Sequence, residues 1–335
     1  SIKVTTLIME LTYMDKWKYL AVLLLIAFNS KADIELYSDE TKSVSMMGEV
    51  DVFADLFNKH TSELPELNKD EDFEVSLEAF VEFQYTHQLR DGLNTFAAFE
   101  IYSYEDRDNE RQTEFDDIYV GLEGKYGTLF IGEAEDSVDV VGILTDISND
   151  GVYALDSLYE EEGKGIRYEY IYSDTYLVSA DMQSSGEDNV DKEYSIAASY
   201  QTDYVNLSAM YTEAGKRMGL DLNAYAIGVG LRNETYYFAA LFSSYEGPYS
   251  QGNGYFNSGK LWSAAASYTW NAFRVYATSV FDSDDQSDNS AIAYTTGVDY
   301  LVNEDMLIFG EYTGSEHDMD NWKTSAAVLG LFYKF

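Results

Sequence analysis

The chain has 335 residues and no cysteine, which excludes disulfide frameworks and thiolate chemistry. Its 60 acidic and 21 basic residues give a net charge of −39, and this charge would repel the backbone of a nucleic acid. Its 30 tyrosines and 18 phenylalanines exclude simple disorder, because disordered chains are poor in aromatic residues.

The first segment of the chain differs from the rest. Residues 14–18 form a short basic segment with two lysines, residues 19–28 form an apolar run, and small residues precede position 33. This pattern predicts a secretory signal peptide that is cleaved after Ala32, with residues 1–32 made of upstream sequence and signal. The alternative is a buried helix or a membrane anchor, but the apolar run is too short to span a bilayer. We therefore expect one mature domain over residues 33–335, since no linker divides it.

From residue 44 onward, apolar residues recur with a period of two, which predicts β-strands with one apolar face. In residues 73–85, for example, one face is apolar or aromatic while the other carries several glutamates. The last strand places an apolar or aromatic residue at every second position up to Phe335. The sixteen predicted strands are 44–57, 71–89, 93–104, 115–125, 127–136, 164–173, 175–185, 193–202, 204–214, 221–232, 235–246, 259–270, 272–282, 290–302, 305–314 and 324–335.

The connections between these strands alternate strictly, with seven short turns and eight longer polar loops. A barrel in which each strand pairs with the next, with turns on one rim and loops on the other, gives this order. A soluble sandwich would mix in Greek-key crossovers. The sequence therefore predicts an all-β fold, a transmembrane antiparallel β-barrel of sixteen strands, which is wide enough to leave an aqueous lumen.

The connection at residues 137–163 is the longest and combines acidic with apolar residues, without Lys or Arg. A loop of this length in a compact fold is usually functional or disordered. We expect this long third external loop to fold into the lumen, with its apolar residues on the wall and its carboxylates at the narrowest point. The alternative is an acidic surface loop.

Carboxylates in and before this loop are the candidate pore residues. The predicted constriction consists of Glu133, Glu135, Asp136, Asp139, Asp146, Asp150 and Arg167. The predicted lumen wall carries Glu74, Glu78, Glu82, Glu100 and Asp117. A tube lined by carboxylates attracts cations and repels anions. For any single carboxylate, a merely solvated wall position is the alternative.

Catalytic and metal-binding patterns are weak. The three histidines share no spacing with Ser and Asp that would suggest a nucleophile held beside a base. The acidic residues at 282–289 lack the ordered spacing of a calcium loop, so we expect at most weak binding of divalent ions. We therefore expect no enzymatic activity, no cofactor and no resident metal.

Two segments resemble a known family. Residues 329–335 (LGLFYKF) and 117–132 (DIYVGLEGKYGTLFIG) resemble the Gram-negative general diffusion porins, close to those of marine gamma-proteobacteria. The resemblance implies a homotrimer in the outer membrane, in contact with the lipid bilayer and lipopolysaccharide, and a third external loop that forms a constriction. It also implies that Tyr333 and Phe335 belong to a signal read by the barrel-assembly machinery.

The chain departs from this family in its charges. The family commonly has Arg where Glu133 follows Gly132, and its cluster of wall arginines is largely missing here. We therefore expect a channel for passive diffusion of small hydrophilic solutes with a preference for cations. The alternatives are an oligosaccharide-selective porin, marked by an aromatic track that could include Tyr102, Tyr104 and Tyr119, or an outer-membrane enzyme or adhesin with a narrower barrel.

Overall fold

The computed structural model describes residues 34–61, 69–70, 74–105, 111–133, 136–149, 164–184, 192–217, 220–251, 254–318 and 322–335. Within them, sixteen long strands form one sheet. They are β2 (Lys42–Thr61), β4 (Glu74–Arg90), β5 (Leu93–Glu105), β6 (Arg111–Gly124), β7 (Gly127–Gly132), β8 (Gly165–Tyr172), β9 (Tyr176–Gln183), β10 (Glu193–Gln201), β11 (Val205–Arg217), β12 (Leu220–Arg232), β13 (Tyr236–Gln251), β14 (Gly254–Trp270), β15 (Phe273–Asp284), β16 (Ser290–Asn303), β17 (Met306–His317) and β18 (Trp322–Lys334). The signal peptide predicted for residues 1–32 lies outside the described residues.

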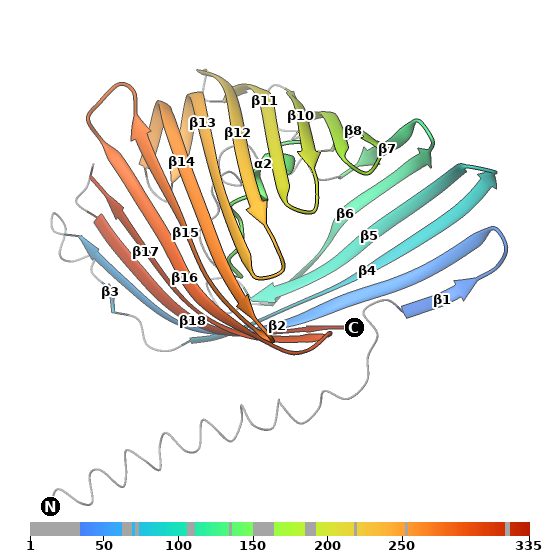
Figure 1. The fold of residues 1–335 in the computed structure, drawn as a ribbon, viewed down its shortest axis with the longest axis horizontal. Helices are drawn as coiled ribbons and strands as arrows, with labels where there is room; N and C mark the ends of the chain where they lie inside the picture. Colours follow the sequence, from blue (N-terminus) through green and yellow to red (C-terminus); the bar gives the residue numbers. More distant parts are fainter. Residues whose placement is uncertain are drawn as a thin grey trace, which may run out of the picture.

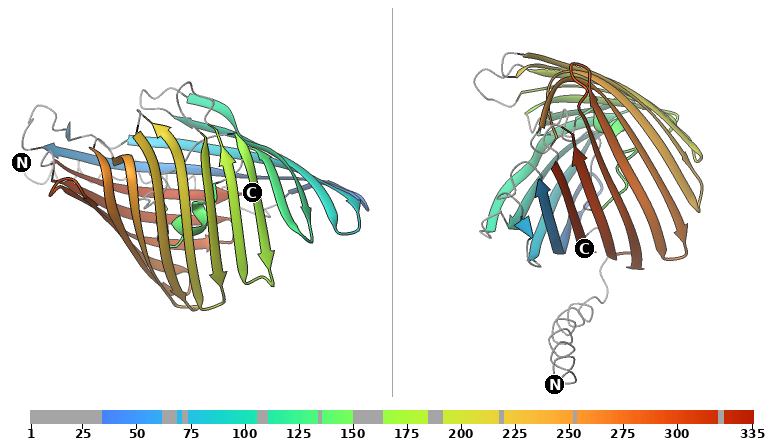
Figure 2. Two further views of the ribbon diagram at one scale, coloured as in Figure 1. Left: turned by 90° about the horizontal axis from the view of Figure 1, so that it is seen from above. Right: turned by 90° about the vertical axis from the view of Figure 1, so that its left-hand side faces the viewer.

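Each long strand pairs antiparallel with the next one along the chain, and β18 pairs with β2, so the sheet closes on itself (Figures 1 and 2). The predicted strand number and order are confirmed. Two short strands were not predicted: β1 (Ile34–Ser38) pairs with the beginning of β2, and β3 (Lys69–Asp70) pairs with its end. Closure through β18 and β2 removes the sheet edges that a bilayer would not tolerate, except that the beginning of β6, before Tyr119, has no described strand on the side of β7.

Exposure alternates along the strands and identifies the two faces. Leu329 is 61% exposed, whereas its neighbour Val328 is 6% exposed. On β12, Ile227 is exposed and Ala226 is fully buried. The exposed register is apolar or aromatic around the barrel, as required of a wall that faces lipid.

The buried register contacts a short segment between β7 and β8. This segment contains α2 (Asp139–Gly142), which touches β10, β11 and β12 and is drawn within the ring of strands in Figure 1. Val138 and Val141 join a buried cluster of wall residues, which are Ala197, Met210, Ala224, Ala226, Leu241, Tyr245, Leu261, Val280 and Ala291. The buried register therefore faces the inside of the barrel. No helix among the described residues has the length and hydropathy needed to cross a membrane.

The C-terminal residue is fixed to the first long strand. The backbones of Phe335 and Gly48 exchange two hydrogen bonds of 2.9 Å. A Cβ at Gly48 would lie 2.6 Å from the Phe335 ring, so only glycine leaves room for the ring at this position. The end of the chain thus completes the seam between β18 and β2.

Candidate functional site

The first part of the long loop is attached to β9. The backbone N–H of Ser137 donates to Oδ2 of Asp181 at 2.8 Å, and its hydroxyl lies 2.6 Å from that of Ser179. Ser137 and Ser179 are fully buried. These contacts hold the beginning of the loop against the inner wall.

The middle of the loop packs on the wall through Leu144. Leu144 is 2% exposed and joins Ala239 and Ala265, while the partly buried Tyr237 packs against them. A Cβ at Gly228 would lie 2.4 Å from Leu144 Cδ1, so the glycine makes room for this side chain. The Tyr237 hydroxyl donates to the Leu144 carbonyl at 2.6 Å, which adds a polar contact to the apolar one.

The last described residue of the loop is held by the opposite strands. The backbone N–H of Asn149 donates to Glu311 at 2.6 Å, and its side-chain amide donates to Tyr276 at 2.9 Å and to Asp299 at 2.8 Å. Asp299 also accepts from Arg274 at 2.5 Å. Residues 136–149 therefore make contacts that extend from β9 to β17.

The predicted constriction residues have different surroundings. Asp136 is 4% exposed, so it is enclosed between loop and wall rather than open to the lumen. Asp139 and Asp146 are half-buried. Glu133 forms an ion pair of 2.9 Å with Lys164. Glu135 and Asp150 lie outside the described residues.

Arg167 lies on the inner face of β8. Its guanidinium forms an ion pair of 2.9 Å with Glu169, donates to Ser179 at 3.3 Å and lies over the Phe130 ring. Its charge is therefore offset by a carboxylate beside it.

The strand pairing places several predicted wall carboxylates on the inner face of the barrel, which is the face that α2 contacts. Glu82 is opposite Glu100, and Glu78 accepts a hydrogen bond of 2.7 Å from the Tyr102 hydroxyl. Asp117 has a positive φ of 49° at a bulge, where the register shift brings Asp116 opposite Glu100. Glu74 begins β4, but its side chain lies outside the described residues.

The sequence prediction missed the group on β15–β17. Arg274, Tyr276, Asp299 and Glu311 share the inner face, and the Tyr276 hydroxyl donates to Glu311. The period of two shows that alternate residues of these strands face the membrane and the lumen. It carries no signal that they meet Asn149, which is more than a hundred residues away in the chain.

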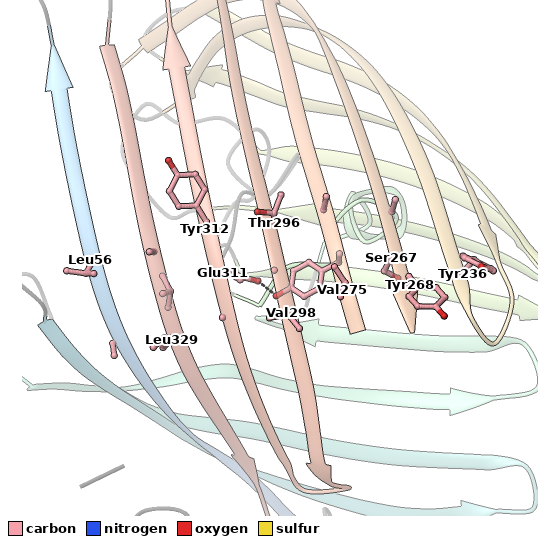
Figure 3. A pocket seen from close by; sticks show the side chains of 18 of the residues that line it. Leu56, Tyr236, Ser267, Tyr268, Val275, Thr296, Val298, Glu311, Tyr312 and Leu329 are labelled. Carbon is pink, nitrogen blue, oxygen red and sulfur yellow. Dashed lines mark hydrogen bonds between the residues drawn. The ribbon is translucent and has the colours of Figure 1, made fainter. Parts of the chain in front are cut away.

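A trough of about 950 Å³ lies elsewhere, over β2 and β13–β18 (Figure 3). Most of its lining belongs to the exposed register, such as Leu56, Val275, Tyr312 and Leu329. It therefore lies mainly on the lipid-facing side of the wall, and Tyr276 and Glu311 of the inner face also line it. Among the described residues, no three His, Cys, Asp or Glu side chains are arranged to hold a metal ion.

Comparisons with known proteins agree with this architecture. The family model described as Gram-negative porin matches residues 20–320. The structure is similar to that of OmpF from Salmonella typhi in complex with daunomycin, with a TM-score of 0.72 and 16% identity over 90% of this chain and 100% of that one. It is also similar to an anion-selective porin from Comamonas acidovorans, with a TM-score of 0.71 and 12% identity over 88% of this chain and 100% of that one. No curated protein matches the sequence.

At these identities the solved structures show the fold and not the ion preference. The family match covers most of the chain. The chain therefore belongs to the Gram-negative porin family and forms a diffusion channel in the outer membrane.

Proposed function

We propose that the channel prefers cations, is not catalytic, and carries small hydrophilic solutes by passive diffusion. The observation that supports this most is the balance of charge on the inner face. Carboxylates gather on β2, β4 and β5, where Asp51 is opposite Glu78 and Glu82 is opposite Glu100. Carboxylates that line a lumen raise the local concentration of cations and lower that of anions.

Three inward-facing basic groups that the structure describes are paired with carboxylates, which limits how far they offset this balance. Arg274 contacts Asp299, and Lys334 forms an ion pair of 3.1 Å with Glu49. Arg167 contacts Glu169 in the same way. An arginine that is paired with a carboxylate offers little net positive charge to a passing anion.

We further propose that residues 137–163 narrow the lumen. The support comes from the described part of the loop, which contacts the inner wall at Ser137, Leu144 and Asn149. Asp139 and Asp146 are half-buried there. They can therefore contribute charge at the passage.

A planar-bilayer measurement tests the proposal. In a KCl gradient, the reversal potential should have the sign that indicates a higher permeability for K⁺ than for Cl⁻. Double substitution of Glu82→Gln and Glu100→Gln should move the reversal potential toward zero, whereas substitution of the outward-facing Thr296→Ser should leave it unchanged. Preference for Cl⁻, or absence of conductance, would refute the proposal.

Selective transport of an oligosaccharide is a second candidate. Tyr102 and Tyr104 stack on the inner face with ring centroids 5.2 Å apart and an interplanar angle of 24°. Tyr119 instead packs edge-on against Phe96 and Phe130. Because sugar rings stack on exposed aromatic faces, current blockade by a low concentration of an oligosaccharide, lost in Tyr102→Ala, would favour this candidate.

We also propose that three copies assemble through the outer face of β4–β6. Phe83 stacks on Phe99 at 5.3 Å, and Phe115 is 65% exposed beside them. In the described residues, β6 pairs with β7 only from Tyr119 onward, so its earlier backbone has no strand on that side. A neighbouring subunit would cover this edge, and conductance steps that come in threes would test it.

The terminal residues Tyr333 and Phe335 are proposed as the signal for the barrel-assembly machinery, and lipopolysaccharide as the outer-leaflet neighbour of the external loops. Deletion of Phe335 should reduce the amount of folded protein in outer-membrane fractions. Refolding into detergent from the unfolded state should be affected much less, because no assembly machinery acts there.

A further inference from the structure

Three carboxyl groups lie near one another at the beginning of the long loop. Asp136 belongs to the loop, Asp181 to β9 and Glu193 to β10, and each is more than nine-tenths buried. Gln183 pairs with Glu193 across the two strands, and Asp181 pairs with Ser195. The charges of Asp181 and Glu193 both act on Asp136, so the three groups form one electrostatic cluster.

Each of the three has one oxygen that is well bonded and one that is not. Oδ1 of Asp136 accepts from the Val138 N–H at 2.7 Å, and Oδ2 of Asp181 accepts from the Ser137 N–H at 2.8 Å. Oε1 of Glu193 lies 3.0 Å from the Thr212 hydroxyl. The other oxygens, which are Asp136 Oδ2, Asp181 Oδ1 and Glu193 Oε2, are buried without a hydrogen-bond partner.

Buried oxygens without partners are costly, and so are buried carboxylates that repel each other. A proton lowers both costs, because it neutralises one carboxylate and adds an O–H donor to the cluster. The three groups are not arranged to share a metal ion, so a proton is the neutralising species that fits this cluster.

Among the described residues, the charges around the cluster are mostly negative. The charged neighbours of the cluster are Asp139 on α2 and Arg167 on β8, and Arg167 is itself beside Glu169. Glu133, which is paired with Lys164, precedes Asp136 by three residues in the chain. Arg167 acts on Asp181 but is also paired with Glu169. Asp136, which lies outside the strands, has its pKa raised to about 9, first by burial and then by Glu193 and Asp181.

We propose that Asp136, Asp181 and Glu193 form a proton-dependent tether, which holds the beginning of the loop on β9 and β10 while the cluster keeps a proton and weakens when the cluster is fully ionised. The inference rests on the channel function, because the loop is observed through its effect on current. A carboxyl that binds its proton more tightly when attached favours attachment most in acid. Attachment therefore weakens as the pH rises above the ordinary carboxyl range, and reaches its minimum above about pH 9.

Single-channel recordings between pH 6 and pH 10 test the tether. The wild-type channel should show step-like fluctuations that become more frequent as the pH rises and level off above about pH 9. Asp136→Asn and Glu193→Gln carry permanently neutral side chains, so their recordings should be much less dependent on pH. Asp174→Asn, which removes an exposed carboxylate in the turn between β8 and β9 at a positive φ that Asn tolerates, should keep the wild-type pH dependence.

A reversible cross-link separates the tether from other titrating groups. The hydroxyls of Ser137 and Ser179 are 2.6 Å apart in a chain without cysteine, so Ser137→Cys with Ser179→Cys can form a single disulfide across the attachment. The current through the oxidised double variant should show few step-like fluctuations at pH 9.5, and a reducing agent should restore the fluctuations. Fluctuations that persist in the oxidised form, or wild-type recordings that do not change with pH, would overturn the tether. Absence of any conductance would overturn the channel function instead.

Discussion

Leu144→Ala tests whether apolar packing holds the loop on the wall. Truncation removes Cγ and both Cδ atoms from a side chain that is 2% exposed and packs between Gly228 and Ala239. Removal of a buried Leu side chain typically costs about 2–5 kcal/mol, since transfer energy is lost and a cavity remains. At about 1.4 kcal/mol per factor of ten, a loss of about 2.8 kcal/mol raises the detached fraction of the loop roughly a hundredfold.

The neighbouring residue provides the control. Ile143 is 66% exposed in the same turn, so Ile143→Ala removes a similar side chain from a position where little packing is lost. Single-channel recordings and swelling of liposomes in sugars of increasing size measure the consequence. Leu144→Ala should fluctuate between conductance levels and admit larger sugars, while Ile143→Ala should behave as wild type. Two variants that cannot be distinguished would refute the packing argument.

Arg274→Gln leaves the buried Asp299 without its ion pair, so the reversal potential in a KCl gradient should move further toward that of K⁺. An unchanged reversal potential would contradict the inference that Arg274 neutralises Asp299. Leu329→Lys places a charge on the lipid face and should lower the free energy of unfolding by about 2–4 kcal/mol in denaturant titrations of the refolded barrel. A change well below about 1 kcal/mol would mean that this face does not contact hydrocarbon. Gly48→Leu should displace the Phe335 ring and lower the temperature at which the folded barrel loses its fast gel mobility, and wild-type behaviour would argue against a role for this contact.

The strands were predictable because their periodicity has a simple cause. A wall between lipid and water needs one apolar face, and the pleat places alternate residues on it. Strand 324–335 showed this directly, and it corresponds to β18. The turns were predictable for a similar reason, since Asn271 and Asp174 adopt the positive φ values that turn residues tolerate.

The short strands β1 and β3 were missed because they carry no long alternation. β1 spans five residues and β3 spans two, and each exists only because β2 extends past its other neighbours. Their hydrogen bonds are tertiary in origin. A local pattern could not have identified them.

The mixed composition of the long loop was evident from the sequence, whereas the environment of each side chain was not. The sequence indicated an acidic loop with apolar residues, and the described part of that loop makes both kinds of contact. It could not indicate that Asp136 is buried beside Asp181, because its chain neighbours are polar or small. It also could not indicate that Arg274 is paired with Asp299, which depends on the register between β15 and β16.

The sequence by itself determined the strand number, the strand order and the excess of acidic residues, since these follow from periodicity, loop length and composition. Only the tertiary structure decided which charges remain available. Whether a carboxylate faces water, an arginine or another buried carboxylate depends on how strands far apart in the chain are paired. Burial and pairing then control its charge, and with it the electrostatics of the channel.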